Sequence, residues 1–342
     1  MPCALVTGAS GMVGGRLVER LVRDHVRVRV LLRPGSQYRE PAHGSVEVVR
    51  DDPYSAAALE RAVAGCDTVF HCAGAVSARS PFQTGGDESV YRRGILDLTT
   101  ALLDRAQRAG VARFIYLSSV AVYASEARSP IAEDAPVAPS SVYGRFKLLA
   151  ESEVRRQRGM PATIVRPCII YGPGDRHFVP ALRTLGAIPL LPLPEGGRSR
   201  MDLVHVEDVV SLLTRAAVTP AAAGHVYNAA SGHPVSLRTI VHIVRSARGT
   251  VTPLVVAVPG RLAIRGSVLA RWYLRLVAPS LLFAATESSV TRFMRDTYFD
   301  VAKAARDLNY QPRYRVEEAL PPCLTPHALF PASRVDLPRT DQ

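Results

Sequence analysis

Tyr143 and Lys147 are four residues apart, so their side chains would lie on one face of a helix. A phenol with the ordinary pKa of about 10 is a poor base at neutral pH. An ammonium group beside it would stabilise the phenolate and lower that pKa. We therefore predict that Tyr143 exchanges a proton with an alcohol or carbonyl oxygen, with Lys147 assisting.

Lysine is scarce in this chain, which gives Lys147 added weight. Of the 42 basic residues only Lys147 and Lys303 are lysines, and the other 40 are arginines. Phe299 stands four residues before Lys303, so the tyrosine–lysine spacing occurs once. A guanidinium is too wide, and its pKa too high, to replace an ammonium beside a catalytic phenol.

Two adjacent serines could complete this chemistry. Ser118 and Ser119 directly follow the apolar run 114–117, which we predict to be a strand. A hydroxyl at this position could hold the substrate oxygen. The residues alone leave both serines as candidates.

A glycine-rich segment near the start of the chain predicts a phosphate-binding turn. The sequence TGASGMVG spans residues 7–14, between a predicted strand and a predicted helix. Its glycines permit a tight turn and a close approach of the backbone to a pyrophosphate, which the helix N-terminus also attracts. We predict that a dinucleotide binds here, where a hydride can move to or from its nicotinamide. The predicted contacts are Gly8, Ser10, Gly11, Met12 and Gly14.

The residues that follow the second predicted strand bear on the choice of cofactor. An acid about 20 positions after the glycines would hold the ribose 2′-hydroxyl of NAD, but this position reads Leu-Arg-Pro. Arg33 could pair with a 2′-phosphate, so we favour NADP over NAD. Alternatively, Arg33 is only an exposed loop cation. Asp52 is expected to accept from the adenine amino group, or else to be an acid near a helix N-terminus.

Strand-like and helical patterns alternate through the first half of the chain. This alternation predicts an α/β fold of the Rossmann type, a doubly wound parallel sheet. A later strand is expected at 226–228, and proline and glycine become frequent after residue 172. We predict a dinucleotide-binding domain over 1–172, a smaller C-terminal substrate lobe over 173–320, and a frayed tail over 321–342. The predicted strands are 4–6, 26–32, 46–49, 68–71, 114–117 and 163–165, and the predicted helices include 15–23, 56–63 and 97–108.

Composition excludes several classes of protein. The net charge is +12, but the arginines are spread along the chain without a dense basic block, so we expect no nucleic-acid partner. The five cysteines form no CxxC motif and no zinc-type cluster with histidine, which predicts no metal site and a reducing compartment. The N-terminus has no signal-peptide pattern, so we expect a cytoplasmic protein.

The segment 261–286 is apolar but carries arginines. Its longest charge-free run, 276–286, is shorter than the roughly 20 residues that a membrane span needs. On one continuous helix ending near Pro279, the four arginines would fall within an arc of roughly 120°. The segment could be an ordinary amphipathic helix covering the core. The alternative is a basic interfacial helix, with peripheral membrane contact through 261–285.

Several segments together resemble the extended branch of the short-chain dehydrogenase/reductase superfamily, which contains NAD(P)-dependent epimerases, dehydratases and 3β-hydroxysteroid dehydrogenases. The likeness covers roughly 3–320. The resemblance implies that Ser119 is the catalytic serine, that Tyr143 is the acid/base, and that Lys147 binds the nicotinamide ribose. It also implies that Ala73, Gly74, Pro167 and Ile170 line the cofactor. The matching segments are TGASGMVG, DTVFHCAG, YLSSVAVY, YGRFK, RPCIIYGPGD, DLVHVEDVV and HVYNAASG.

Two positions depart from the family pattern. Members usually carry an asparagine where Ile95 stands, so either its structural or proton-relay role is met otherwise or activity is reduced. Members that act on nucleotide sugars often place an arginine directly before the aspartate that matches Asp202. Here Met201 precedes Asp202, and Arg200 lies one residue further back, which weakens a nucleotide-sugar assignment.

The C-terminal pattern favours a hydrophobic substrate. Residues 287–290, 298–304 and 308–312 are similar to the ending of the 3β-hydroxysteroid dehydrogenase group, whose members act on sterols, sterol carboxylates and long-chain β-hydroxy or β-keto acids. We therefore predict an NAD(P)-dependent oxidoreductase that interconverts a secondary alcohol and a ketone on a small hydrophobic substrate, with a homodimer as a further hypothesis. The alternatives are a nucleotide-sugar epimerase, dehydratase or reductase, and a dinucleotide-binding protein without catalysis.

Overall fold

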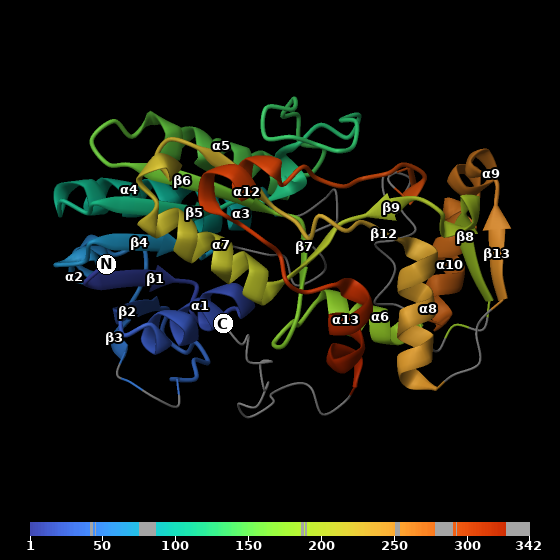
Figure 1. The fold of residues 1–342 in the computed structure, drawn as a ribbon, viewed down its shortest axis with the longest axis horizontal. Coiled ribbons are helices and arrows are strands. Elements are labelled where there is room, and N and C mark those ends of the chain that lie inside the picture. The colour runs from blue at the N-terminus through green and yellow to red at the C-terminus, as the bar shows by residue number, and fades with distance from the viewer. Residues whose placement is uncertain are drawn as a thin grey trace, which may run out of the picture.

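The computed structural model describes residues 1–41, 44, 46–74, 87–185, 188, 190–249, 254–277, 290–291 and 293–325. Its centre is a seven-stranded parallel sheet with the order β11-β6-β5-β4-β1-β2-β3 (Figure 1). This order is that of a doubly wound sheet, so the predicted fold class is confirmed. Each predicted strand is present with small shifts at its ends. The strands are β1 Cys3–Thr7, β2 Arg27–Leu32, β3 Val46–Arg50, β4 Thr68–His71, β5 Arg113–Leu117, β6 Ala162–Pro167 and β11 Val226–Ala229.

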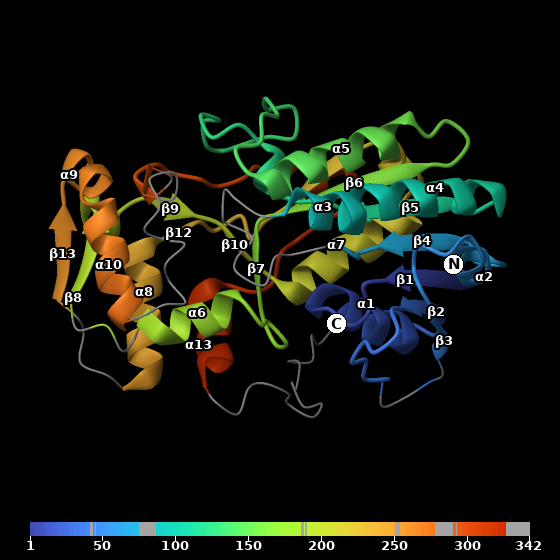
Figure 2. The same ribbon diagram turned by 180° about the vertical axis from the view of Figure 1, so that it is seen from behind.

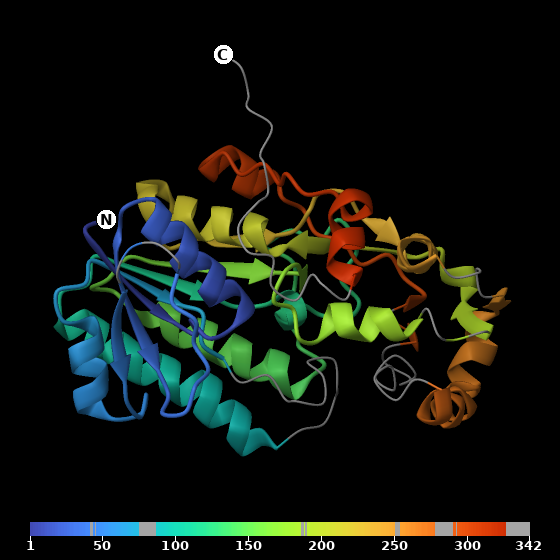
Figure 3. The same cartoon turned by 90° about the horizontal axis from the view of Figure 1, so that it is seen from below.

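Helices cover both faces of this sheet, as Figure 3 shows. One face carries α1 Met12–Arg23, α7 Val206–Val218 and α12 Ala302–Leu308. The other face carries α2 Ala56–Val63, α4 Leu98–Arg108 and α5 Val142–Arg156. The strands read as nearly continuous apolar runs because both of their faces are buried.

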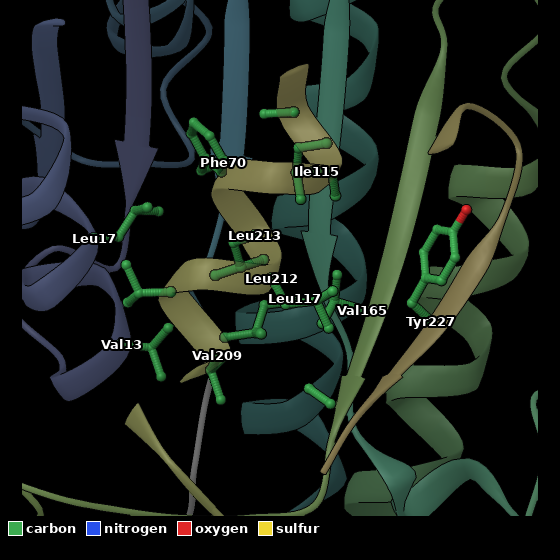
Figure 4. Close-up of a cluster of buried hydrophobic side chains, with 14 of the residues drawn as sticks. Val13, Leu17, Phe70, Ile115, Leu117, Val165, Val209, Leu212, Leu213 and Tyr227 are labelled. Atoms are coloured by element: carbon green, nitrogen blue, oxygen red, sulfur yellow. The ribbon is translucent and has the colours of Figure 1, made fainter. Parts of the chain in front are cut away.

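The core under α7 illustrates this packing (Figure 4). Val209, Leu212 and Leu213 of α7 are fully buried among side chains of α1 and of the strands. Helix α7, strand β11 and helix α12 all come from the chain after residue 172. The Rossmann unit therefore includes more of the later sequence than the one strand expected at 226–228.

A second lobe extends from the sheet and has its own apolar core (Figure 2). Its core includes Leu182, Ile240 and Leu320 from three different helices. Its helices are α6 Phe178–Leu185, α8 Leu237–Arg248, α9 Gly260–Arg265, α10 Ser267–Val277 and α13 Val316–Leu324. Its short strands pair as β10 Leu203–His205 with β7 Ile169–Tyr171, β12 Val235–Ser236 with β9 Arg200–Met201, and β13 Leu254–Val258 with β8 Leu190–Pro194.

Two sequence predictions differ from the structure. The expected tail, 321–342, begins inside α13, because Leu320, Cys323 and Leu324 are buried and hold Pro321 and Pro322 in the helix. The single helix expected from residue 261 to near Pro279 is divided into α9 and α10 at Gly266, so its arginines do not lie along one helix. Residues 278–286 and 326–342 lie outside the described part of the chain.

A chain of hydrogen bonds through His71 ties β1 and β4 to the helix before β5. Its Nδ1 lies 2.7 Å from the Thr7 hydroxyl, and its Nε2 lies 2.9 Å from the Thr99 hydroxyl. The Thr99 hydroxyl donates to the carbonyl of Ile95, and the Thr7 hydroxyl accepts from the amide of Ala73. His71 is therefore satisfied as the neutral Nε2–H tautomer. Full burial lowers the pKa of His71 to about 3.

This lowered pKa predicts a loss of stability in acid. The unfolded chain binds a proton at the ordinary pKa of about 6.5, whereas the folded chain does not, so stability falls as pH drops below that value. From pH 7 to pH 5 this one group should cost about 2 kcal/mol of unfolding free energy. We expect the difference in unfolding free energy between the wild type and His71→Gln, measured by urea denaturation, to change by that amount. The exposed His225 provides the control, since His225→Gln should parallel the wild type. If the difference in unfolding free energy between the wild type and His71→Gln is the same at pH 7 and pH 5, the prediction is contradicted.

Candidate active site

The carboxyl ends of three neighbouring strands meet at one edge of the sheet. Thr7 of β1 pairs with His71 of β4, and His71 pairs with Tyr116 of β5. The strand order reverses between β1 and β4, which is where doubly wound folds form a crevice for a ligand. The predicted site segments leave the sheet at this edge.

The glycine-rich turn forms a cradle that only glycine can build. Gly8 has φ +75°, and an added Cβ would lie 2.7 Å from the amide nitrogen of Ala73. At Gly14 a Cβ would overlap the carbonyl of Gly8. Gly11 caps α1 without a side-chain hydrogen bond, so the N–H groups of the first turn remain available to an anion. This open helix end, with Ser10 and Met12 half-buried beside it, fits a pyrophosphate.

Arg33 and Asp52 lie at the ends of the next two strands. Arg33 directly follows β2 and is exposed, and its guanidinium makes no ion pair with any described residue. Asp52 is also exposed, and one of its carboxylate oxygens accepts the amide of Tyr54 at 3.1 Å. Ser55, rather than Asp52, caps α2. Both groups are therefore free to meet a ligand.

Tyr143, Lys147 and Ser119 come together above β5. Ser141 caps α5, and its hydroxyl accepts from the amide of Gly144, which places Tyr143 in the first turn. Ser119 lies close enough to the phenol of Tyr143 to lower its pKa. The Nζ of the buried Lys147 lies 6.0 Å from the centre of the Tyr143 ring and donates to the carbonyl of Leu117 at 2.7 Å.

The same lysine reaches the segment after β4. A Cβ on Gly74 would lie 3.4 Å from the Nζ of Lys147, so the ammonium borders the Ala73–Gly74 turn. On the other side, Pro167 ends β6 and Ile170 lies half-buried in β7. The predicted lining residues therefore surround the carboxyl edge of β4, β5 and β6.

The electrostatics differ from the expectation for Tyr143. Burial raises the pKa of Tyr143 to about 12, and the neighbouring Ser119 hydroxyl opposes this only in part. The expected lowering by Lys147 is absent because the ammonium points to the Leu117 carbonyl. Burial also lowers the pKa of Lys147 to about 8, although the charge of Glu151 favours its protonated form. At neutral pH both groups keep their protons.

A buried carboxylate that sequence reasoning missed separates the roles of the two serines. Ser118 donates to Glu151 at 2.5 Å, whereas the Ser119 hydroxyl accepts from the amide of Ala121 and remains partly exposed. Arg166 makes two further hydrogen bonds to Glu151, at 2.9 and 2.7 Å. Glu151 follows Lys147 by four residues, a spacing that places both on one face of α5 and could have identified it.

Ile95 occupies a distorted helical turn beside this site. Residues Arg92–Asp97 form a π-helix, and the Ile95 side chain is packed in the core under α4 and α5. Its carbonyl accepts the Thr99 hydroxyl at 2.5 Å. Ile95 thus contributes an apolar core contact and a backbone acceptor at this position.

The comparisons with known proteins agree with this geometry. A model of the NAD dependent epimerase/dehydratase family matches residues 4–230. The chain belongs to this family. It is an NAD(P)-dependent enzyme of the extended short-chain dehydrogenase/reductase type, with a nicotinamide dinucleotide as its cofactor.

The matches to individual relatives extend over almost the whole length of this chain. A 3 beta-hydroxysteroid dehydrogenase/Delta 5-->4-isomerase of Mycobacterium tuberculosis is 31% identical over 94% of this chain and 89% of the relative. A 2-alkyl-3-oxoalkanoate reductase of Shewanella oneidensis is 26% identical over 93% of this chain and 84% of the relative. The structure of MoeE5 in complex with UDP-glucose and NAD superposes with a TM-score of 0.71 and 25% identity, covering 94% of this chain and 97% of that one.

The burial of Lys147 predicts that this residue lowers the unfolding free energy of the protein at neutral pH. Holding an ammonium whose pKa is lowered from 10.5 to about 8 opposes folding at neutral pH. This penalty shrinks as pH rises from about 8 to 10.5, because the unfolded chain still binds the proton there. Lys147→Met should therefore raise the unfolding free energy at pH 7, by on the order of 2 kcal/mol, while turnover is lost.

Chemical denaturation without cofactor measures this change. The matched control is Lys303→Met at the other lysine, which is half-buried and lies at a distance from the site. We expect no gain in stability from that control. A Lys147→Met protein less stable than the wild type would show that the lysine is a structural residue.

Proposed function

We propose that this enzyme interconverts a secondary alcohol and a ketone on a hydrophobic substrate and prefers NADP. The observation that carries the proposal is the convergence of three side chains, with Ser119 beside the Tyr143 phenol and Lys147 between this pair and the Ala73–Gly74 turn. This arrangement offers a hydroxyl donor, an acid and a fixed positive charge at the carboxyl edge of β5. The alternative without catalysis gives no reason to bury a lysine there.

In the proposed reaction the side chains handle the oxygen and its proton. The bound nicotinamide dinucleotide supplies or accepts the hydride. Ser119 donates a hydrogen bond to the substrate oxygen and fixes its position. Tyr143, whose phenol is protonated at neutral pH, gives its proton to the oxygen during reduction and takes it back during oxidation. The Lys147 ammonium, which borders the Ala73–Gly74 turn, would hold the nicotinamide ribose.

A hydrophobic substrate is favoured by two independent observations. The curated relatives include proteins named for hydroxysteroids and for 2-alkyl-3-oxoalkanoates, both of which carry an alcohol or ketone on a largely hydrocarbon skeleton. Asp202, where nucleotide-sugar members carry a preceding arginine, is buried and accepts from Ser231 and from the amide of Phe299. The nearby Arg200 pairs with Asp296 instead of remaining free for a diphosphate. We propose that the second lobe holds the apolar part of the substrate.

Tyr143→Phe tests the acid/base role. The variant keeps the ring and its packing but lacks the transferable proton, so kcat should fall by roughly 10²–10⁴-fold while cofactor affinity stays near that of the wild type. Steady-state oxidation and reduction of a sterol and a β-keto acid would measure kcat, and fluorescence titration would measure cofactor binding. The neighbouring Tyr91, whose ring centre is 6.2 Å from that of Tyr143, gives the control Tyr91→Phe, which should stay active. Equal activity of Tyr143→Phe and the wild type would refute the role.

Arg33→Asp tests the cofactor preference. Loss of a charged hydrogen-bond donor to a 2′-phosphate should lower the ratio of kcat/KM for NADP over NAD by about 10- to 100-fold. Arg39→Asp makes the same charge change on another exposed arginine of the loop and should leave the ratio unchanged. The ratio would be measured with both cofactors and one substrate. An unchanged ratio in Arg33→Asp would remove Arg33 from the cofactor site.

A further inference from the structure

The end of the second lobe carries a cluster of exposed apolar side chains. Helices α9 and α10 lie there beside β8 and β13, away from the central sheet (Figures 1 and 2). Leu276 is 80% exposed and Leu269 is 75% exposed, although both sit on a helix that also contributes to the core. We call this cluster the α9–α10 surface. It comprises Leu262, Val268, Leu269, Trp272 and Leu276.

Helix α10 divides into three faces. Tyr273 and Leu274 point inward and pack against the core of the second lobe, and the Tyr273 hydroxyl donates to the carbonyl of Leu190. At about 100° per residue, the exposed apolar residues fill a separate arc of roughly 100°. Arg271 and Arg275 border that arc and are exposed. A helix that served only to cover the core would need the inward face alone.

Arginines dominate the charge around this surface, although the exposed carboxylate of Glu195 accepts from the amide of Gly260 at the start of α9. Arg261, Arg265, Arg271 and Arg275 are all exposed, and none makes an ion pair with another described residue. No aspartate or glutamate occurs in the sequence between Asp208 and Glu287. This contrasts with the helices of the Rossmann unit, where exposed arginines pair with neighbouring acids, as Arg20 does with Asp24. The unpaired arginines of α10 place positive charge along one edge of the exposed apolar arc.

We propose that the α9–α10 surface docks on a lipid bilayer that contains anionic headgroups. The leucines and Val268 would enter the acyl boundary, and Trp272 suits the interface because its ring is apolar and its indole N–H can donate. The arginines lie where their stems can follow the apolar surface while the guanidinium groups reach phosphates. Among the described residues, no helix has the length and apolar character to cross a bilayer, so the contact is peripheral.

This docking would place the second lobe against the phase in which a hydrophobic alcohol or ketone dissolves. It goes beyond the proposed reaction, and it does not depend on turnover. Vesicle binding can be measured on the cofactor-free full chain, so a failed binding test and a failed activity test are distinguishable.

The chain contains its own reporter, because Trp272 is its single tryptophan. Adding vesicles of phosphatidylcholine with about 30% phosphatidylglycerol should shift the tryptophan emission to the blue, and brominated acyl chains should quench it. Vesicles of phosphatidylcholine alone should bind more weakly, and added salt should weaken binding to the anionic vesicles. An emission spectrum that does not respond to anionic vesicles would overturn the proposal.

Co-sedimentation with the same vesicles tests the two components separately. Leu269→Ser/Leu276→Ser removes apolar contact and should lower the partition coefficient at least about tenfold. Arg271→Gln/Arg275→Gln removes two charges and should lower it by roughly 20- to 30-fold on anionic vesicles alone. Because all four side chains are exposed, the thermal unfolding of both variants should match that of the wild type.

Matched controls and one rival occupant complete the test. Val218→Ser, at an apolar residue 63% exposed at the end of α7, and Arg108→Gln, at an exposed arginine of α4, should bind vesicles as the wild type does. If the control variants lose as much vesicle binding as the variants of the α9–α10 surface, the proposal is overturned. If the surface instead covers a second copy of this chain, the emission will shift with protein concentration in the absence of lipid, and light scattering will give the mass of a dimer. That result would also overturn lipid docking.

Discussion

The ion pair between Glu151 and Arg166 is the contact on which the geometry of the site depends. It joins α5 to β6 at full burial, and the same carboxylate accepts the hydroxyl of Ser118 from the end of β5. A buried ion pair contributes little net stability, but removing one partner is costly, so it specifies which groups must meet. In this protein it fixes the position of α5 along the sheet. The helix then carries Lys147 and Tyr143 to the carboxyl edge one and two turns before Glu151.

A second chain of hydrogen bonds positions the Ala73–Gly74 turn. His71 links the hydroxyl of Thr7, at the end of β1, to that of Thr99 in α4, and Thr7 also holds the amide of Ala73. These hydrogen bonds therefore fix the positions of the glycine cradle and the Ala73–Gly74 turn relative to each other, on the two sides of the point where the strand order reverses. The π-helical turn contributes to the same chain of hydrogen bonds, because the Ile95 carbonyl accepts from Thr99 and is its last acceptor. Ile95 thus anchors this chain of hydrogen bonds through its backbone.

The sequence predicted the sheet well because parallel strands are buried on both faces. Continuous apolar runs such as 68–71 and 114–117 mark such strands without help from distant residues. The cradle and the Tyr143–Lys147 pair were also local patterns. The contacts that were not predicted depend on tertiary packing. Arg166 meets Glu151 across 15 residues, and the direction of the Lys147 ammonium toward Leu117 follows from that docking. The helical state of Pro321 and Pro322 depends on the burial of their neighbours against α6 and α8.

The order of elements along the chain has a consequence for how the molecule can be divided. The second lobe takes α6, then α8 to α10, and finally α13, while α7, β11 and α12 return between them to the Rossmann sheet. The chain thus crosses between the two units repeatedly, so no single cut separates them. A fragment that ends after β7 would lack α7 and β11, and a chain shortened at Leu308 would lack the helix that closes the core of α6 and α8. The two units must therefore fold as one cooperative whole, and new lobes can be exchanged in evolution only by replacing several insertions together.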